Sequence, residues 1–434
     1  MLRRSPYDRE ILSLALPALG ALAAEPLYVL ADTAIVGHLG RPQIAALGLA
    51  GTVLTEAFAL FNFLTYATTA VVARASGAGE RERAGELAAQ ALWLSLGIGL
   101  ALLVLGEATA GPLLRALGGH GRSGHYALEY FRIAALGLPP AMVALAGQGF
   151  LRGVAQLRRP LEIVVAANAV NLVLELFFVY GLRWGIAGSA AGTAIAQAGM
   201  GAAFVVELLR APARSRRPRL DALRPLTRIG RQIFVRTAAL VSAFVVAASI
   251  LARVGDAALG AHQIAFELFL FLALVLDAIA IAGQVLVGRT LGGGDAERAH
   301  EAAARMIAWS VALGLIFALA LLALEPWLPR AFTGDAGVLH QAKLLWPFFA
   351  LLQPLGGAVF ALDGILIGAS DTSYLMWSML AASLLVFLPL ALLSLALGWG
   401  VVGVWVAIDA LLVARLVFLG VRFAGGRWAV VGWA

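Results

Sequence analysis

Two carboxylates lie inside the first long apolar stretch of the sequence, where ionisable side chains are rare. Glu25 and Asp32 are seven residues apart, which puts them two turns apart on one helix face, with a bend expected at Pro26. An ionisable group inside a membrane span costs roughly 2.5–3.5 kcal/mol, so both are functional candidates. Tyr28 lies one turn from Asp32 and is placed to line the same cavity and stack on a flat or cationic ligand.

A second polar stripe interrupts another apolar stretch, VVAANAVNLVLELFFVY. Asn168, Asn171 and Glu175 follow the i, i+3, i+7 pattern of one helix face. Thr193 and Gln197 form an i, i+4 pair in the next stretch. Two carboxylates with neutral oxygens suit a proton or a hard cation such as Na⁺. The alternative is a static polar network between helices.

These polar groups require helices that cross a membrane, and the composition predicts them. The 434 residues are 61% hydrophobic and 13% charged, with a mean hydropathy of +0.89, which excludes a set of water-soluble domains. We therefore expect an all-α integral membrane protein whose first apolar run is kept as a helix rather than cleaved as a signal. The twelve expected spans are 11–37, 44–73, 84–106, 126–150, 160–181, 186–209, 229–252, 259–288, 299–323, 341–367, 374–397 and 400–423.

The basic residues predict the orientation of these spans. Of the 32 Lys and Arg residues, 22 fall in segments on the side of the N-terminus, among them Arg3 and Arg4, and 7 fall on the opposite side. This asymmetry predicts that both termini are cytoplasmic. The longest basic segment, residues 211–231, is expected to contact anionic lipid. It lacks interleaved aromatic residues that stack on bases, so no nucleic-acid partner is expected.

Several kinds of chemistry are excluded by what the sequence lacks. It has no Cys, and its six His residues show no HExxH spacing, which excludes disulfides, thiol catalysis and the usual structural zinc sites. No Ser-His-Asp order and no cofactor fingerprint are present. We therefore predict that the protein is not an enzyme and has no resident cofactor.

The chain matches itself at an offset of 215 residues. RASGAGERERAGELAA at 74–89 pairs with RTLGGGDAERAHEAAA at 289–304 in one register. Such a repeat predicts a duplicated six-helix unit, with both copies entering the membrane from the same side. The expected halves are residues 1–209 and 229–434, joined by a basic linker at 210–228. Two similar bundles of this kind suit alternating access.

The second half also carries polar residues within its expected spans. Asp363 is the repeat partner of Gln148, so one position is acidic in one half and neutral in the other. Arg236 and Arg415 are candidate partners for the acids, and a structural ion pair and a coupling role are equally open. The other candidates in this half are Glu267, Asp277 and Gln284, with Asp409 nearby.

The stretches EPLYVLADTAIVGHLG (25–40), NAVNLVLELFFVYG (168–181) and ALDGILIGASDT (361–372) resemble the multidrug and toxic compound extrusion (MATE) family, in particular its DinF-like bacterial branch. The resemblance covers essentially the whole chain. It implies twelve helices in two lobes and an antiporter that exports amphipathic, often cationic compounds in exchange for H⁺ or Na⁺.

The resemblance also assigns roles to individual residues. Asp32 matches the family's first-helix aspartate, and Thr193 matches its sixth-helix threonine. Asn171 and Glu175 match its fifth-helix pattern of Asn followed four residues later by Asp. The longer Glu175 keeps the charge but shifts it, which puts tight Na⁺ geometry in doubt more than proton binding. Tyr130 falls where related members place a cavity tyrosine.

We therefore expect a monomeric antiporter of the bacterial inner membrane, driven by H⁺ rather than Na⁺, that exports small organic compounds. The alternative is a flippase for a lipid-linked precursor, although such a protein should hold several arginines inside its cavity. A major-facilitator-type transporter should carry a GxxxDRxGRR-like loop, and ARASGAGERERAG does not fit it. The expected coupling residues are Asp32, Glu175, Asn171, Asn168 and Thr193, and the expected cavity residues are Glu25, Tyr28, Tyr130, Gln148 and Gln197.

Overall fold

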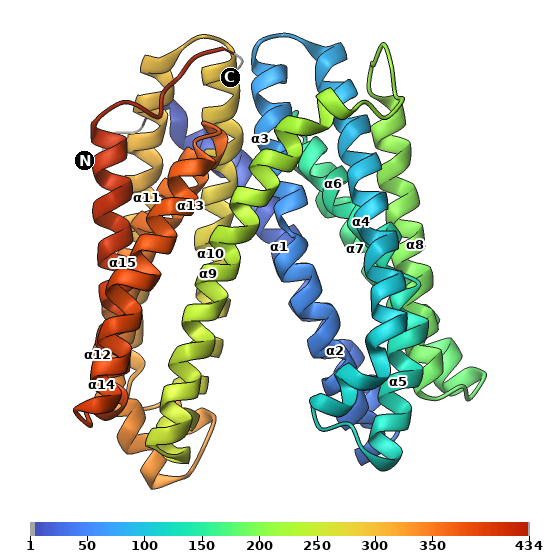
Figure 1. Ribbon diagram of the computed structural model, residues 1–434, viewed down its shortest axis with the longest axis vertical. Coiled ribbons are helices and arrows are strands. Elements are labelled where there is room, and N and C mark those ends of the chain that lie inside the picture. Colours follow the sequence, from blue (N-terminus) through green and yellow to red (C-terminus); the bar gives the residue numbers. More distant parts are fainter. Residues whose placement is uncertain (1–4, 433–434) are drawn as a thin grey trace. The chain divides into compact units, whose positions relative to one another are not determined.

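The computed structural model describes residues 5–432, and these residues form helices and connecting loops with no strand (Figure 1). The first eight α-helices are α1 (Pro6–Gly37), α2 (Arg41–Phe61), α3 (Phe63–Gly77), α4 (Arg81–Ala116), α5 (Gly121–Ala135), α6 (Leu138–Gly153), α7 (Arg158–Leu176) and α8 (Ile186–Arg210), with the π-helix η1 (Phe177–Gly181) after α7. The next seven are α9 (Leu220–Val254), α10 (Asp256–Gly292), α11 (Ala296–Leu324), α12 (Ala336–Gly368), α13 (Thr372–Ala381), α14 (Leu388–Ala396) and α15 (Gly400–Ala424). Two short elements complete this part, the 3₁₀-helix η2 (Pro329–Ala331) and the π-helix η3 (Ala382–Phe387).

These helices make twelve candidate membrane spans in the described chain, as the apolar runs predict. Eleven are long and apolar enough by themselves, and the bent pair of α5 and α6 makes the twelfth. That pair bends by 51°, where Pro139 and Pro140 lack the N–H groups that would continue the hydrogen bonds of α5. The protein is therefore a multi-pass membrane protein. Arg3 and Arg4, which the orientation argument counts, lie outside the described residues.

The described chain divides into two compact units, residues 20–230 and residues 5–19 with 231–432. Each unit has its own apolar core, supplied mainly by α2, α5 and α8 in the first and by α9, α10, α12 and α15 in the second. Two boundaries differ from the expected ones. The non-helical linker is shorter than residues 210–228, because α9 already begins at Leu220. The beginning of α1 belongs with the second half of the chain rather than the first.

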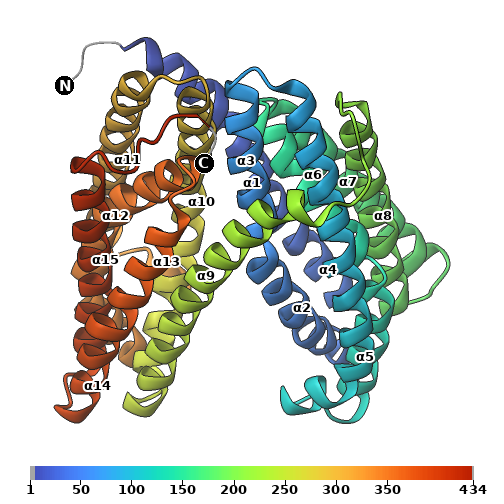
Figure 2. The same ribbon diagram turned by 45° about the horizontal axis from the view of Figure 1, so that its top comes forward.

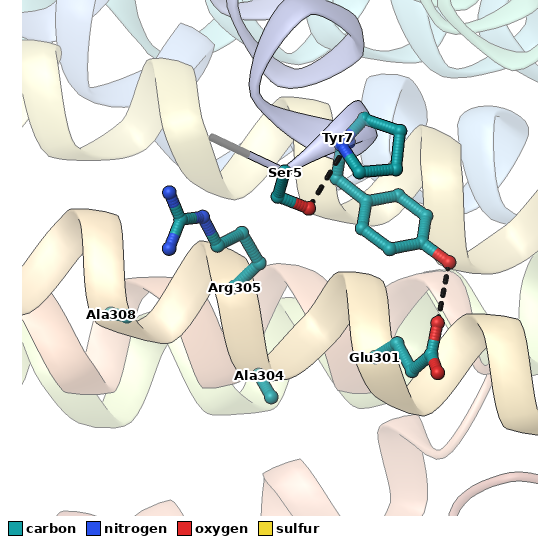
Figure 3. Close-up of a pocket in the computed structure, with 7 residues that line it drawn as sticks. Ser5, Tyr7, Glu301, Ala304, Arg305 and Ala308 are labelled. Carbon is teal, nitrogen blue, oxygen red and sulfur yellow. Dashed lines mark hydrogen bonds between the residues drawn. The ribbon is translucent and has the colours of Figure 1, made fainter. Parts of the chain in front are cut away.

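The beginning of α1 groups with the second half because its polar side chains are held by α11. Asp8 accepts hydrogen bonds from Arg305 Nε at 2.7 Å, from Arg305 Nη2 at 2.9 Å and from Trp309 Nε1 at 2.9 Å. Tyr7 donates its hydroxyl hydrogen to Glu301 at 2.8 Å (Figure 3). A shallow cavity of about 530 Å³ lies beside these contacts. Long-range polar contacts of this kind leave no periodic signal in the sequence.

The duplication is visible in the way corresponding helices cross. In the first half, a Cβ added to Gly149 of α6 would lie 2.6 Å from the carbonyl oxygen of Thr65 in α3. In the second half, a Cβ added to Gly364 of α12 would lie 2.1 Å from the carbonyl oxygen of Ala280 in α10. Gly364 and Ala280 each lie 215 residues after their counterparts Gly149 and Thr65, which is the offset of the sequence repeat. Only glycine fits at either crossing, so these corresponding helices pack against each other in the same way in both halves.

Candidate cation-coupling site

Asp32 lies where α1 meets the first turn of α8. Its side chain is buried, with 5% exposed, and its Oδ1 accepts a hydrogen bond from the fully buried Ser189 hydroxyl at 2.8 Å. Ser189 belongs to the first turn of α8, where the helix dipole favours a negative charge. The hydrogen bond to Ser189 joins α1 to α8 at this carboxyl group. Ser189 was not among the expected residues, although it extends the stripe of Thr193 and Gln197 by one turn.

Glu175 and Asn171 of α7 face the same region as Asp32. Glu175 is 0% exposed and Asn171 is 3% exposed. Among the described residues, neither carboxylate oxygen of Glu175 nor the Oδ1 of Asn171 has a hydrogen-bond partner. The side chains of Asp32 and Glu175 interact electrostatically, and two like charges at these positions repel each other. A bound proton or cation would relieve that repulsion and satisfy these buried acceptors.

A glycine brings α7 and α8 close enough to build this arrangement. A Cβ added to Gly192 of α8 would lie 3.2 Å from the backbone nitrogen of Glu175 and 3.3 Å from Asn171 Oδ1. Such contacts are tighter than ordinary van der Waals contacts, so a side chain here would push α7 away. The crossing at Gly192 therefore sets how near the Glu175 carboxyl group lies to α8.

Two tyrosines enclose the same region. The Tyr28 hydroxyl of α1 and Thr193 Oγ1 of α8 are 2.9 Å apart and share a hydrogen bond. Tyr130 of α5 is buried, with 3% exposed, and interacts with Thr193 and with both carboxyl groups. The structure thus gathers Asp32, Glu175, Asn171, Thr193, Tyr28 and Tyr130 in the unit formed by residues 20–230. We call these six residues and Ser189 the carboxylate cluster.

Other expected residues of this half lie elsewhere or have different partners. Asn168 Nδ2 donates to the carbonyl oxygen of Ala24 at 3.0 Å, a contact that ties α7 to α1. Glu25 is exposed. Gln148 accepts a hydrogen bond of 3.4 Å from Arg152 on its own helix. Gln197 is half-buried, and its Oε1 has no hydrogen-bond partner among the described residues. Helix α1 continues through the expected bend at Pro26 as one helix.

The main polar feature of the second half is an ion-pair cluster. Asp363 of α12 accepts hydrogen bonds from Arg415 of α15, at 2.6 and 2.7 Å, and from Arg236 of α9. Their side chains are 7%, 5% and 15% exposed, respectively. With two guanidinium groups for one carboxylate, this cluster carries a positive charge and does not favour a cation. Of the other candidates, Glu267 is exposed and accepts from Gln263, Asp277 is half-buried, and Gln284 and Asp409 are buried.

Comparisons with known proteins agree with this architecture. The sequence model of the MatE family matches residues 17–177 and 233–393, two segments that start 216 residues apart. The chain is 31% identical to the chloroplastic protein DETOXIFICATION 44 of Arabidopsis thaliana over 96% of its own length and 81% of the relative's. It is 27% identical to DNA damage-inducible protein F (DinF) of Escherichia coli strain K12 over 96% of its own length and 90% of the relative's.

A solved structure has the same fold. It is described as the outward-facing conformation of a multidrug resistance MATE family transporter of the MOP superfamily. It superposes with a TM-score of 0.85 at 22% sequence identity and covers 98% of this chain and 96% of that one.

Proposed function

Because the chain belongs to the MATE family, we propose that it is a multidrug antiporter that exchanges protons, rather than Na⁺, for amphipathic cationic compounds. The observation that carries this proposal is the pair of buried, interacting carboxyl groups of Asp32 and Glu175 in the carboxylate cluster. We place the protein in the bacterial cytoplasmic membrane as a monomer with both termini cytoplasmic, on the strength of the arginine asymmetry and the DinF relative.

The proposed exchange follows from charge. With both carboxyl groups ionised, the cluster has a charge of minus two in an apolar surrounding, and an organic cation or a proton lowers its energy. Uptake of a proton removes part of that attraction and releases the substrate. Two ligands that compete for one charged site and are never bound together are the basis of antiport.

The surrounding hydrogen bonds favour H⁺ over Na⁺. A hard metal cation needs a shell of several oxygen ligands, whereas a proton needs one. Ser189 already donates to Asp32, and the hydroxyls of Tyr28 and Thr193 are hydrogen-bonded to each other. Of the neutral oxygens named above, Asn171 Oδ1 and Gln197 Oε1 have no hydrogen-bond partner among the described residues, and two are fewer than the shell of a metal ion needs. In the described residues, no group of three or more His, Cys, Asp or Glu side chains is arranged to hold a metal.

The cluster also offers a path from proton binding to movement of α1. Asp32 and Tyr28 join α1 to α8 through their contacts with Ser189 and Thr193. A charge-assisted hydrogen bond is about twice as strong as a neutral one, so protonation of Asp32 weakens the link to Ser189. We propose that α1 shifts on α8 as the proton and the substrate replace each other, in an alternating-access cycle.

Dye transport by the purified protein in liposomes tests this function. An imposed pH gradient should drive ethidium transport in the wild type, and an imposed Na⁺ gradient at constant pH should not. Asp32→Asn and Glu175→Gln should each reduce pH-driven transport by at least about ten-fold. Glu162→Gln is the matched control, because Glu162 is an exposed carboxylate on α7, paired at 3.1 Å with Arg159. Transport at the wild-type rate by a folded Asp32→Asn protein would refute the proposal. Transport driven only by the Na⁺ gradient would show that the coupling ion is Na⁺ rather than H⁺.

A further inference from the structure

The connection between α8 and α9, residues 211–219, lies against α4 (Figures 1 and 2). We call it the linker strap. A Cβ added to Gly85 of α4 would lie 2.1 Å from the carbonyl oxygen of Pro212. The backbone of the strap therefore rests directly on the helix, at a position that only glycine leaves open.

Two side chains of α4 bind the backbone of the strap. Gln90 is 1% exposed; its Nε2 donates to the carbonyl oxygen of Arg217 at 2.9 Å, and its Oε1 accepts from the backbone nitrogen of Arg219 at 2.9 Å. Trp93 Nε1 donates to the carbonyl oxygen of Arg216 at 2.8 Å. These contacts use backbone groups only, so they fix the strap without engaging the guanidinium groups of Arg217 and Arg219.

Some arginines of this region have partners within the protein. Arg214 pairs with Glu82, and Arg210 pairs with Glu207 at 3.1 Å. Arg216 Nη2 donates to the carbonyl oxygens of Leu209 and Ala211, at 2.7 and 2.9 Å, and so satisfies carbonyl groups at the end of α8. Arg214 and Arg216 thus hold the strap in place, whereas the pair of Arg210 and Glu207 lies within α8.

Between residues 217 and 228, three arginines are exposed and have no acidic partner among the described residues, whereas Arg224 pairs with Asp221. They are Arg217 and Arg219 in the strap and Arg228 in α9. Arg219 directly precedes α9, whose N-terminal backbone groups add positive potential. Arg217, Arg219 and Arg228 thus leave unneutralised positive charge along the strap and the first turns of α9, and an anion there would neutralise it.

The strap lies at the level expected for lipid headgroups. Helix α4 has 36 residues, about 54 Å, whereas the hydrocarbon core of a bilayer is about 30 Å thick, so α4 must project beyond it. Trp93 is 44% exposed and lies three turns from the beginning of α4. Exposed Trp side chains mark the membrane–water boundary. Because Trp93 binds the strap, the strap lies at that boundary.

We infer that the linker strap and the beginning of α9 form a binding surface for anionic phospholipid headgroups. Arg217, Arg219 and Arg228 each bind lipid phosphodiester groups, since a guanidinium fork matches phosphate oxygens in geometry as well as charge. The hydrogen bonds of Gln90 fix the backbone at Arg217 and Arg219 before the lipid arrives, which lowers the entropic cost of binding. This inference does not depend on which compound the protein transports.

Quenching of tryptophan fluorescence by brominated lipids tests the inference on the full chain, purified in lipid-free detergent. Brominated phosphatidylglycerol should bind the wild type more tightly than brominated phosphatidylcholine. Replacing Arg217, Arg219 and Arg228 together by Gln should weaken phosphatidylglycerol binding about a hundred-fold, since each surface arginine contributes about five-fold. Replacing the same three residues by Lys keeps the charge but not the guanidinium fork, so binding by this monodisperse variant should lie between that of the wild type and that of the triple-Gln variant.

The matched control removes three exposed arginines from the opposite expected membrane face, Arg41, Arg115 and Arg330, and should leave binding unchanged. Equal binding of the two brominated lipids by the wild type would overturn the inference. So would unchanged phosphatidylglycerol binding in a monodisperse triple-Gln variant. Complete displacement of the lipid by millimolar inorganic phosphate would identify a site for free phosphate instead and would also overturn it.

Discussion

Replacing Asp363 by Asn should destabilise the protein strongly, because this carboxylate is the only acidic partner of two arginines in its ion-pair cluster among the described residues. Arg415 is 5% exposed and Asp363 is 7% exposed, so water can compensate little for the lost charge. Removal of one member of a buried pair typically costs about 3–5 kcal/mol, and we expect a loss in that range. Most of it should come from Arg415, since Arg236 is more exposed, at 15%.

A double-mutant cycle measures this effect and separates it from a role in transport. The midpoint of thermal unfolding in detergent should fall sharply for Asp363→Asn and should partly recover in Asp363→Asn/Arg415→Met, which removes the stranded cation. Glu267→Gln is the control, because Glu267 is an exposed carboxylate of the same half with Gln263 as its partner.

The opposite pattern would refute the structural reading of this cluster. If the Asp363→Asn protein unfolds at the wild-type temperature and yet does not transport the dye, Asp363 is a coupling residue rather than part of a structural ion pair between helices. The positive charge of the cluster argues against that result, because a cation would have to bind beside Arg236 and Arg415.

Three further substitutions probe the packing that positions the site. Gly364→Ala should lower the thermal midpoint, because its Cβ would lie 2.1 Å from a carbonyl oxygen of α10, whereas Gly97→Ala, with open space around it, should not. Gly192→Val should reduce dye transport several-fold by pushing α7 from α8, and Gly199→Val on the same helix, where no atom lies within 4 Å, should leave transport unchanged. Asp8→Asn weakens three hydrogen bonds to α11 and should speed amide hydrogen exchange in the first turns of α1; unchanged exchange would contradict the anchoring role.

Much of the fold could be predicted because it depends on composition and periodicity. The length of the apolar runs gives the twelve spans, and the single offset of 215 gives the duplication, which the crossings at Gly149 and Gly364 then display in three dimensions. The helices cross in the same way in the two halves because these small residues allow their backbones to approach closely.

Contacts between distant segments could not be predicted in the same way. The attachment of α1 to α11 depends on Asp8. From the sequence alone, this residue is only an acidic residue near a helix N-terminus, and nothing there indicates a contact with α11. Ser189 is a common small residue, and only its place one turn before Thr193 connects it with the cluster. Glu25 shares a predicted face with Asp32 but is exposed, because periodicity fixes a direction along one helix and not what lies opposite.

The most direct test of the account is whether substrate binding releases a proton from the carboxylate cluster. Ethidium added to the purified protein in weakly buffered detergent solution should release protons, detected with a pH indicator dye, in proportion to the ethidium bound. Release should fall sharply in Asp32→Asn and in Glu175→Gln and persist in Glu162→Gln. Ethidium binding without proton release in the wild type, or undiminished release from the Asp32→Asn/Glu175→Gln double variant, would contradict exchange at these carboxyl groups.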